Sequence, residues 1–312
     1  MRYLCAPIQG FTDYVWRRAH ASLFGGVERY YSPFLRIERG EMRKRDLADV
    51  NPVNNAGLTL VPQIIGCQPE QAQRLVLALR DMGYSEVDIN MGCPYPPMAL
   101  HHKGSGLIPH PAEVEALFSC LAGIDGVSYS IKMRLGWDEP RQWREIVPLF
   151  DILRPTQVTI HPRVGKQQYK GDLVMEEMDA AVELIRYPLV YNGDVTSLDD
   201  AAAIEHRYPS LSAIMIGRGL VQNPAMLCPD KAMPAAYRAL HDEIYADYEA
   251  RMNGGDKQLV IKMKALWEMY LPFAPKKQLK AVKKASNLER YNAAVSALFA
   301  EMEGDLNLGI RN

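Results

Sequence analysis

Short apolar segments alternate with longer amphipathic ones through the first part of the chain. The short segments are rich in β-branched and aromatic residues, as strands are, and the longer ones space apolar residues three or four positions apart, as helices do. Eight strands are predicted, over Tyr3–Ala6, Arg29–Pro33, Leu60–Ile65, Val87–Asn90, Tyr129–Met133, Gln157–Ile160, Leu189–Tyr191 and Ala213–Ile216. Helices are predicted over Pro69–Met82, Ala112–Leu121, Gln142–Leu153, Met175–Ile185 and Ser197–Arg207.

This alternation predicts an α/β fold in which eight parallel strands close into a (β/α)8 TIM barrel. An open, doubly wound sheet is the alternative. Such sheets often carry a Gly-x-Gly-x-x-Gly motif after the first strand, and none follows Tyr3–Ala6.

The pattern changes after Gly219. Prolines interrupt Asn223–Pro234, which is therefore predicted to be a connector. Four helices follow, over Ala235–Met252, Lys257–Tyr270, Lys276–Ser286 and Glu289–Met302. We therefore predict a barrel domain over residues 1–230 and a small all-α helical domain over residues 235–312.

Composition favours a soluble protein with a substantial core, because 48% of the residues are apolar and 23% are charged. No apolar run reaches the ~20 residues that span a bilayer, and the N-terminal segment lacks the features of a signal peptide. The five cysteines are odd in number and contain no Cys-x-x-Cys pair, a pattern typical of reduced thiols. We expect a cytoplasmic protein with no membrane association.

Charge is distributed unevenly. The whole chain carries a formal charge of −1, but Lys257–Arg290 holds nine basic residues and two acids. In Lys276–Lys284 the lysines recur at helical spacing, so they are predicted to line one side of a helix. One concentrated basic region on a nearly neutral protein favours selective binding of a polyanion, although a solvated helix face is the alternative.

Polar residues gather where three predicted strands end. Because side chains alternate along a strand, Asp88 and Asn90 share one face, as do Lys132 and Arg134 on the next strand and Thr159 and His161 on the one after. The carboxyl ends of barrel strands meet at one rim, where barrel enzymes carry their active sites. Singly, each residue could be structural. Their convergence predicts a site for an anionic or electron-rich partner, since unpaired buried charge is costly.

The last two predicted strands end in glycine motifs, Tyr191-Asn-Gly-Asp194 and Ile216-Gly-Arg-Gly219. Barrels commonly hold a phosphate in these loops, where glycine allows a close approach to backbone N–H groups. Gly217 and Gly219 are therefore expected to permit that approach, and Arg218 to supply positive charge.

Cys93 follows the fourth predicted strand, between Gly92 and Pro94. Most free cysteines are small buried hydrophobes, and we expect this of Cys5, Cys67, Cys120 and Cys228. A cysteine at a catalytic rim can instead act as a general acid, since a thiol pKa of about 8.5 keeps it protonated at neutral pH. His101 or His102 could activate it as a nucleophile, or bind a metal with Cys93 and His110. No ligand spacing matches a known tetrahedral site, so no metal is predicted.

These motifs, in this order, resemble those of the dihydrouridine synthases over essentially the whole chain. The matching segments are Ala6-Pro-Ile-Gln-Gly10, Gln63, Asp88-Ile-Asn-Met-Gly-Cys-Pro94, Lys132-Met-Arg-Leu-Gly136, His161-Pro-Arg163 with Tyr169, Tyr191-Asn-Gly-Asp194 and Ile216-Gly-Arg-Gly219. Tyr95-Pro-Pro97 departs from the pattern, because the family often has basic residues there. Ile8 and Gln9 replace the more common Met and acidic residue.

The resemblance implies an FMN-binding barrel followed by an RNA-binding helical domain, and NADPH-driven reduction of a uridine C5=C6 bond in tRNA. It makes Cys93 the catalytic proton donor to C5, opposite the hydride delivered to C6. The cofactor residues it implies are Pro7, Ile8, Gln9, Gln63, Lys132, His161, Asn192, Gly193, Asp194, Gly217 and Arg218. The substrate residues are Asn90, Arg134, Arg163 and Tyr169, with Lys276, Lys280 and Lys283 contacting RNA.

We therefore expect a monomeric tRNA-dihydrouridine synthase. The alternatives are a dihydrouridine synthase acting on ribosomal RNA, a small-molecule FMN oxidoreductase with the same barrel, and an RNA-binding protein without catalysis. The lysine-rich helix disfavours the small-molecule enzyme, and the presence of Cys93, Lys132 and His161 disfavours loss of catalysis.

Overall fold

The computed structural model describes residues 1–66 and 68–309, so Cys67 and the last three residues of the predicted helical domain lie outside the described residues. The chain forms two compact units. The first comprises residues 1–10, 27–195 and 199–217, and the second comprises residues 11–26, 196–198 and the chain from Arg218 onward. The functional division into a catalytic domain over residues 1–230 and an RNA-binding domain over residues 235–312 stays a prediction.

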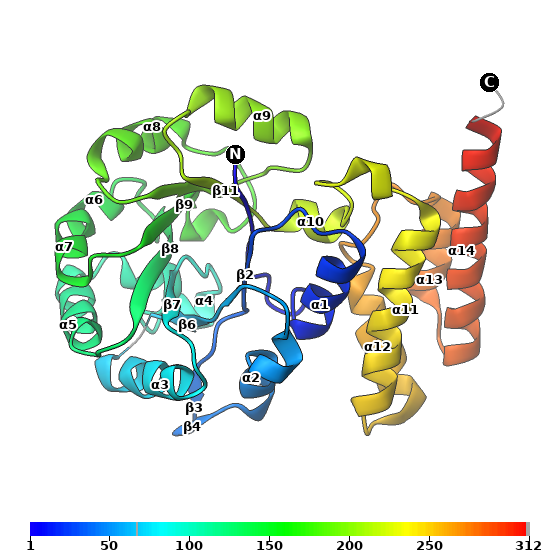
Figure 1. Cartoon of the computed structure of the whole chain (residues 1–312), viewed down its shortest axis with the longest axis horizontal. Helices are drawn as coiled ribbons and strands as arrows, with labels where there is room; N and C mark the ends of the chain where they lie inside the picture. Colours follow the sequence, from blue (N-terminus) through cyan, green and yellow to red (C-terminus); the bar gives the residue numbers. More distant parts are fainter. Residues whose placement is uncertain (67, 310–312) are drawn as a thin grey trace. The chain divides into compact units, whose positions relative to one another are not determined.

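A parallel sheet forms the centre of the first unit (Figure 1). Its hydrogen-bonded order is β5-β2-β1-β11-β10-β9-β8-β7-β6. The strands are β1 (Tyr3–Cys5), β2 (Arg29–Tyr31), β5 (Leu60–Val61), β6 (Gln63–Ile65), β7 (Glu86–Met91), β8 (Ser128–Gly136), β9 (Gln157–Val164), β10 (Leu189–Tyr191) and β11 (Ala213–Ile216). Each predicted strand has a counterpart here, and β8 and β9 continue beyond their predicted ends.

The sheet closes on itself through residues 60–65. Here β5 pairs with β2 and β6 pairs with β7, so two halves of one extended segment bond to different neighbours. Pro62 separates the halves because it has no backbone N–H, but its carbonyl still accepts from Asp88 N at 2.9 Å. Counted this way, nine short strands form an eight-position barrel, which confirms the predicted fold class.

Helices cover the outside of these strands, as Figure 1 shows for α3, α5, α7 and α8. Four match the predicted helices closely, namely α3 (Pro69–Asp81), α5 (Pro111–Ala122), α8 (Met175–Leu184) and α9 (Leu198–Arg207). The helix predicted over residues 142–153 is instead divided into α6 (Trp143–Ile146), the 3-10 turn η3 (Val147–Leu149) and α7 (Phe150–Leu153). Pro148 lies at this break, where it cannot donate a helical hydrogen bond.

Several short elements of the first unit carry no periodic signal and were not predicted. They are the hairpin of β3 (Ile37–Glu38) and β4 (Glu41–Met42), the helices α2 (Lys44–Asp49) and α4 (Pro96–Ala99), and the 3-10 turns η1 (Pro52–Asn55), η2 (Gly104–Leu107) and η4 (Gly165–Gln167). The hairpin and the α4–η2 segment both bear on function below.

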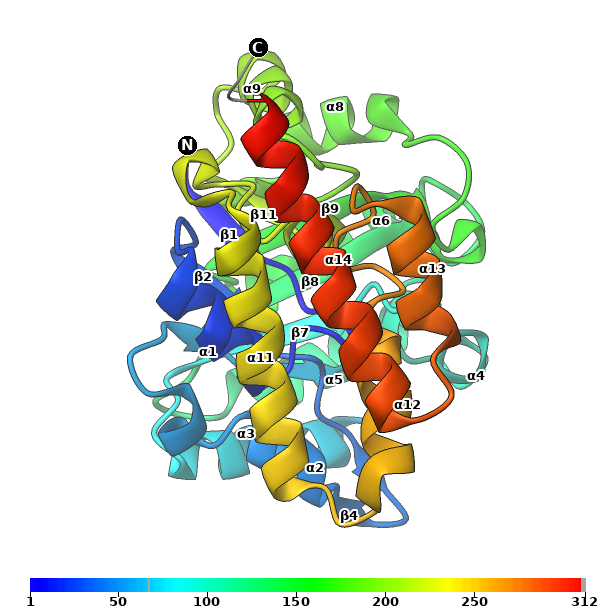
Figure 2. The same cartoon turned by 90° about the vertical axis from the view of Figure 1, so that its right-hand side faces the viewer.

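The second unit is helical. It contains α1 (Tyr14–Leu23), α10 (Arg218–Gln222), η5 (Pro229–Lys231), α11 (Pro234–Arg251), α12 (Gly255–Leu266), α13 (Lys276–Lys284) and α14 (Leu288–Gly309). Helix α14 packs against α11, α12 and α13 (Figure 2). In its core the Tyr291 hydroxyl accepts from Trp267 Nε1 at 2.9 Å and lies 2.7 Å from His241 Nε2, so these buried polar atoms are satisfied.

Helix α1, which the sequence pattern did not predict, belongs to this helical unit, although its residues fall within the predicted barrel domain of residues 1–230. Asp13 caps α1 by accepting from Trp16 N, and its other oxygen accepts from the Tyr248 hydroxyl of α11 at 2.6 Å. Across the part of the chain that the structure describes, every helix is too short or too polar to cross a membrane.

Candidate active site

A buried hydrogen-bond chain crosses the barrel interior. Asn90 Nδ2 donates to Gln63 Oε1 at 2.7 Å, and Gln63 Nε2 donates to Asp88 Oδ2 at 2.6 Å. Ser130 Oγ donates to the other Asp88 oxygen, also at 2.6 Å. Gln63, Asp88 and Ser130 are neighbours in register on β6, β7 and β8. The inward side chains expected from strand alternation therefore meet, and both oxygens of the carboxylate are satisfied.

Two ionisable groups in the barrel interior have pKa values displaced in opposite directions. Burial raises the pKa of Asp88 to about 6, despite the hydrogen bonds from Ser130 and Gln63. Burial, together with the neighbouring Arg134, lowers the pKa of Lys132 to about 8. Lys132 Nζ donates to Asn192 Oδ1 at 2.8 Å, and Asn192 in turn donates to the Met215 carbonyl. Buried ionisable groups with shifted pKa values are typical of functional sites.

The Asn90 side chain also fixes the loop that holds Cys93. Its Oδ1 accepts from the backbone N–H groups of Gly92 at 3.0 Å and Cys93 at 2.8 Å. On the other side of the loop, Ser105 donates to the Cys93 carbonyl through both its backbone N–H and its hydroxyl. Cys93 is thus held from two directions while its side chain stays partly exposed.

The thiol of Cys93 is protonated at neutral pH. Burial raises its pKa, and this effect outweighs the Tyr95 backbone hydrogen bond and the positive charges of Arg134, Arg36 and Lys132, which lower it. A nucleophilic cysteine needs the opposite shift. The electrostatics therefore suit a proton donor.

His161, Arg163 and Asp194 form a second group. Arg163 makes a bidentate ion pair with the Asp194 carboxylate. One nitrogen of its guanidinium group also lies 3.2 Å from His161 Nε2. A guanidinium group donates but cannot accept, so His161 Nε2 is the acceptor in this contact. Arg163, expected at the substrate, is thus bonded to the loop expected to hold phosphate.

Gly193 and Gly217, two of the three glycines in the strand-end motifs, lie in tight surroundings. A Cβ at Gly217 would come 3.0 Å from the Ile8 side chain, and one at Gly193 would come 3.1 Å from Leu173 and 3.5 Å from His161. Ile8 belongs to Pro7–Gln9, the segment that follows β1, whose end is bonded to β11 through Ala6 N and the Ile216 carbonyl. The motif that contains Gly217 thus adjoins the segment expected to contact the cofactor, whereas Gly193 adjoins His161. Arg218 begins α10, in the second unit.

The sequence model of the family described as "Dihydrouridine synthase (Dus)" matches residues 4–302. The chain belongs to the dihydrouridine synthase family. Membership confirms the predicted family and the predicted class of enzyme, an oxidoreductase.

Individual relatives agree with this assignment. The chain is 30% identical over 226 residues to tRNA-dihydrouridine synthase B of Pasteurella multocida, covering 72% of this chain and 67% of that one. It is 28% identical over 320 residues to a probable tRNA-dihydrouridine synthase of Rhodobacter capsulatus, covering 96% and 95%. Its fold resembles the old yellow enzyme of Trypanosoma cruzi, with a TM-score of 0.50, 9% identity, and coverage of 77% and 88%. At this identity the likeness concerns the fold alone.

Within this dihydrouridine synthase, a cavity of about 450 Å³ opens beside Cys93. Tyr95 and Tyr169 contribute aromatic surface, and Gln9, Phe34, Pro94, Pro96 and Gln168 also line it. The Arg134 guanidinium lies 5.4 Å from the centre of the Tyr169 ring and donates to the Val164 carbonyl. Cys93 and Tyr169, from separate motifs, thus share one cavity.

Three residues of this cavity, Arg36, Arg43 and Arg45, were missed by the sequence analysis. Arg36 and Arg43 flank the β3–β4 hairpin, and Arg45 lies on α2. Each has an acidic partner outside the cavity lining. Arg36 pairs with Glu38 at 3.3 Å, and Arg43 donates two hydrogen bonds to the Asp46 carboxylate, at 2.8 and 2.6 Å. Arg45 lies 3.8 Å from Asp46. The sequence signal for these residues was the high density of basic residues over positions 36–45. Such a segment is usually a solvated turn, and only the packing of the chain shows that it lies beside Cys93.

The lysines predicted to contact RNA lie on α13, in the second unit. Lys276 and Lys280 are exposed, whereas Lys283 is half-buried and pairs with Glu268 at 3.5 Å. The predicted lysine-rich helix face is present, with Lys283 at its edge.

Replacing Asp88 with Asn should change how stability depends on pH. The folded-state pKa of about 6 exceeds the ordinary value of 3.8, so the folded protein holds the extra proton between these values. Stability contributed by the protonated Asp88 is complete below about pH 4 and lost as pH rises through 6. Relative to wild type, the free energy of unfolding of the variant should therefore rise by up to about 3 kcal/mol between pH 4 and 7. Urea unfolding at four pH values measures this. Parallel profiles for the two proteins would contradict it.

Proposed function

We propose that this chain is an FMN-dependent tRNA-dihydrouridine synthase that uses NADPH to reduce a uridine C5=C6 bond. The observation that carries the proposal is the protonated, partly exposed thiol of Cys93 beside an aromatic, arginine-rich cavity at the rim of the family's barrel. The names of the relatives from Pasteurella multocida and Rhodobacter capsulatus support tRNA as the substrate.

The residues at the rim fit an FMN group. Gly193 and Gly217 lie where an added Cβ would crowd the side chains of Leu173 and Ile8. Glycines in such loops allow backbone N–H groups to approach a phosphate. The Asp194 carboxylate alone would repel that phosphate, but its ion pair with Arg163 neutralises the carboxylate charge. The residues proposed to hold FMN are Pro7, Ile8, Gln9, Gln63, Lys132, His161, Asn192, Gly193, Asp194, Gly217 and Arg218. When bound, FMN would supply the hydride that the uracil accepts at C6.

Lys132 is proposed to place a positive charge beside the polar edge of the flavin ring. Its ammonium group has three N–H donors, of which Asn192 takes one. The lowered pKa shows that the charge is poorly solvated in the interior, so an electron-rich partner would stabilise it. The hydrogen bond to Asn192 holds the group in place for that partner.

Cys93 is proposed to protonate uracil C5. The double bond gains a hydride at C6 and a proton at C5, which saturates it, and the resulting thiolate recovers a proton from solvent through the open side of the cavity. Asn90, Arg134, Arg163 and Tyr169 are proposed to contact the target nucleotide. A base in folded tRNA must leave its stack to reach this depth, and aromatic side chains can then receive it.

Arg36, Arg43 and Arg45 are proposed to bind backbone phosphates of the target nucleotide and its neighbours. The same arginines lower the cost of bringing a polyanion close to a buried thiol, because they offset its charge. Lys276, Lys280 and Lys283 are proposed to bind the tRNA at a part of the molecule other than the target nucleotide. We also propose that the enzyme acts as a cytoplasmic monomer.

Changing Cys93 to Ala should abolish dihydrouridine formation while leaving the flavin bound. Loss of a general acid lowers rate by about a hundredfold or more. The measurement is dihydrouridine content of tRNA after incubation with NADPH, alongside the visible absorbance of the flavin. Cys120→Ala, a partly buried thiol on α5, is the matched control and should keep activity. Near-normal turnover by Cys93→Ala would refute the proton-donor role.

The double variant Lys276→Glu/Lys280→Glu should weaken tRNA binding and reduce its salt dependence. Each lost phosphate contact lowers the slope of log affinity against log salt by about 1. Binding measured at several salt concentrations tests this, with flavin content as the check on the fold. Arg80→Glu/Arg186→Glu alters the same number of charges near the amino ends of β7 and β10, away from the rim, and should bind normally. Equal slopes for both double variants would reject the assignment.

The double variant Arg36→Ala/Arg45→Ala should raise KM for tRNA about tenfold with little change in kcat, because phosphate contacts position the substrate without taking part in proton transfer. Steady-state kinetics with tRNA measure both constants. Arg39 lies on the β3–β4 hairpin outside the cavity lining, so Arg39→Ala serves as control. A fall in kcat at unchanged KM would contradict phosphate binding.

A further inference from the structure

A group of three potential metal ligands lies behind the Cys93 loop. His102 follows α4, His110 is the residue before α5, and Glu113 lies in the first turn of α5. One nitrogen from each imidazole and one oxygen from the carboxylate all lie within 4.8 Å of one another. Two imidazoles and a carboxylate form a ligand set that suits zinc and similar transition metals better than magnesium or calcium.

The geometry of the group is close to that of a coordination site. His102 Nδ1 lies 2.7 Å from Glu113 Oε1, and the His102 and His110 rings stack with centres 3.6 Å apart. Tetrahedral zinc, with bonds of about 2.1 Å, separates its ligand atoms by about 3.3 Å. The two rings must tilt out of their parallel stack to aim at one ion. All three side chains are at least partly exposed, which leaves room for that rotation.

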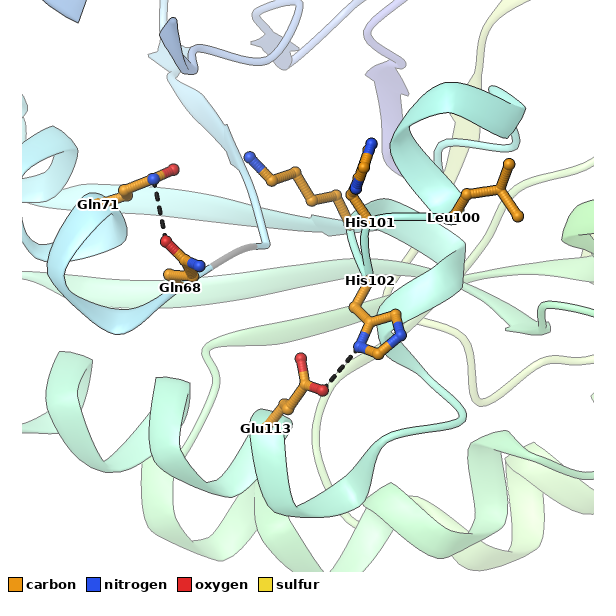
Figure 3. Close-up of a pocket in the computed structure, with 7 residues that line it drawn as sticks. Gln68, Gln71, Leu100, His101, His102 and Glu113 are labelled. Carbon is orange, nitrogen blue, oxygen red and sulfur yellow. Dashed lines mark hydrogen bonds and ion pairs between the residues drawn. The ribbon is translucent and has the colours of Figure 1, made fainter. Parts of the chain in front are cut away.

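The surroundings leave space for a bound ion and water. A cavity of about 540 Å³ adjoins His102 and Glu113 and is lined further by Gln68, Gln71, Leu100, His101 and Lys103. Figure 3 shows His102 and Glu113 pointing toward each other from the turn after α4 and the start of α5. His101 points away from Glu113 in the same view.

We propose that His102, His110 and Glu113 form a transition-metal site, with zinc as the fitting ion and water completing its coordination. On binding, the metal replaces the proton shared by His102 Nδ1 and the Glu113 carboxylate, and that proton passes to solvent. Cys93 is not a ligand, so this site differs from the Cys93-centred one that the sequence spacing disfavoured.

A bound metal would restrain the segment between His102 and His110, which contacts the loop that carries Cys93. Between His102 and His110 the chain passes through η2, where Ser105 makes both of its hydrogen bonds to the Cys93 carbonyl. Gly104 packs so closely that an added Cβ would lie 2.8 Å from Cys93 Cβ. A metal bridging the turn to α5 therefore restrains the segment that backs Cys93.

Metal titration of tag-free, chelator-treated protein tests the site. Calorimetry with Zn²⁺ should show one bound ion per chain, with a heat that depends on the buffer because a proton is released. Co²⁺ should give the visible bands of low-symmetry coordination. His110→Ala and Glu113→Gln should each weaken Zn²⁺ binding at least about tenfold, the scale seen when metal-site partners are removed.

His101→Ala is the matched control, because this neighbouring histidine points away from the group. It should bind Zn²⁺ as wild type does. Hydrogen exchange of residues 99–107 should slow when Zn²⁺ is added to wild type and should not change in Glu113→Gln. Absence of stoichiometric binding, or equal weakening in His101→Ala and His110→Ala, would overturn the proposal.

Discussion

The closure of the barrel through residues 60–65 is the constraint on which the site depends. Because β5 bonds to β2 and β6 bonds to β7, Gln63 lies beside Asp88 in the interior. Its amide then serves two partners, donating to Asp88 and accepting from Asn90. Because the side-chain N–H of Asn90 donates to Gln63, its side-chain oxygen faces the loop and accepts from the backbone N–H groups of Gly92 and Cys93. The position of Cys93 thus follows, bond by bond, from how the sheet closes.

Asp88 and Lys132 are buried beside neutral hydrogen-bond partners rather than opposite charges, and burial therefore shifts their pKa values. Asp88 satisfies both oxygens with neutral donors, and its pKa rises. Lys132 is bonded to a neutral amide, and its pKa falls. Arg163, by contrast, meets the carboxylate of Asp194 directly. The barrel therefore keeps one position with a poorly solvated cation and another with a neutralised ion pair.

The segment from Gly92 to Glu113 joins two features that would otherwise be separate. Its first part carries Cys93, its middle bonds back to the Cys93 carbonyl through Ser105, and its end supplies the proposed metal ligands. Close packing leaves little freedom in between, since a Cβ at Gly106 would lie 2.1 Å from the Ala99 carbonyl oxygen. Close contacts therefore connect the two ends of this segment.

Sequence alone determined the barrel, the order of its strands and the identity of the inward polar residues, because side-chain alternation along a strand records which face is buried. It also determined the lysine-rich face of α13, since helical spacing is equally local. Tertiary structure alone decided that Arg36, Arg43 and Arg45 line the cavity beside Cys93, that α1 joins the helical unit, and that Glu113 meets His102 and His110. Each of these three arrangements involves a segment without a periodic sequence pattern, or brings together residues from separate elements. Their proximity arises from packing, which local patterns do not encode.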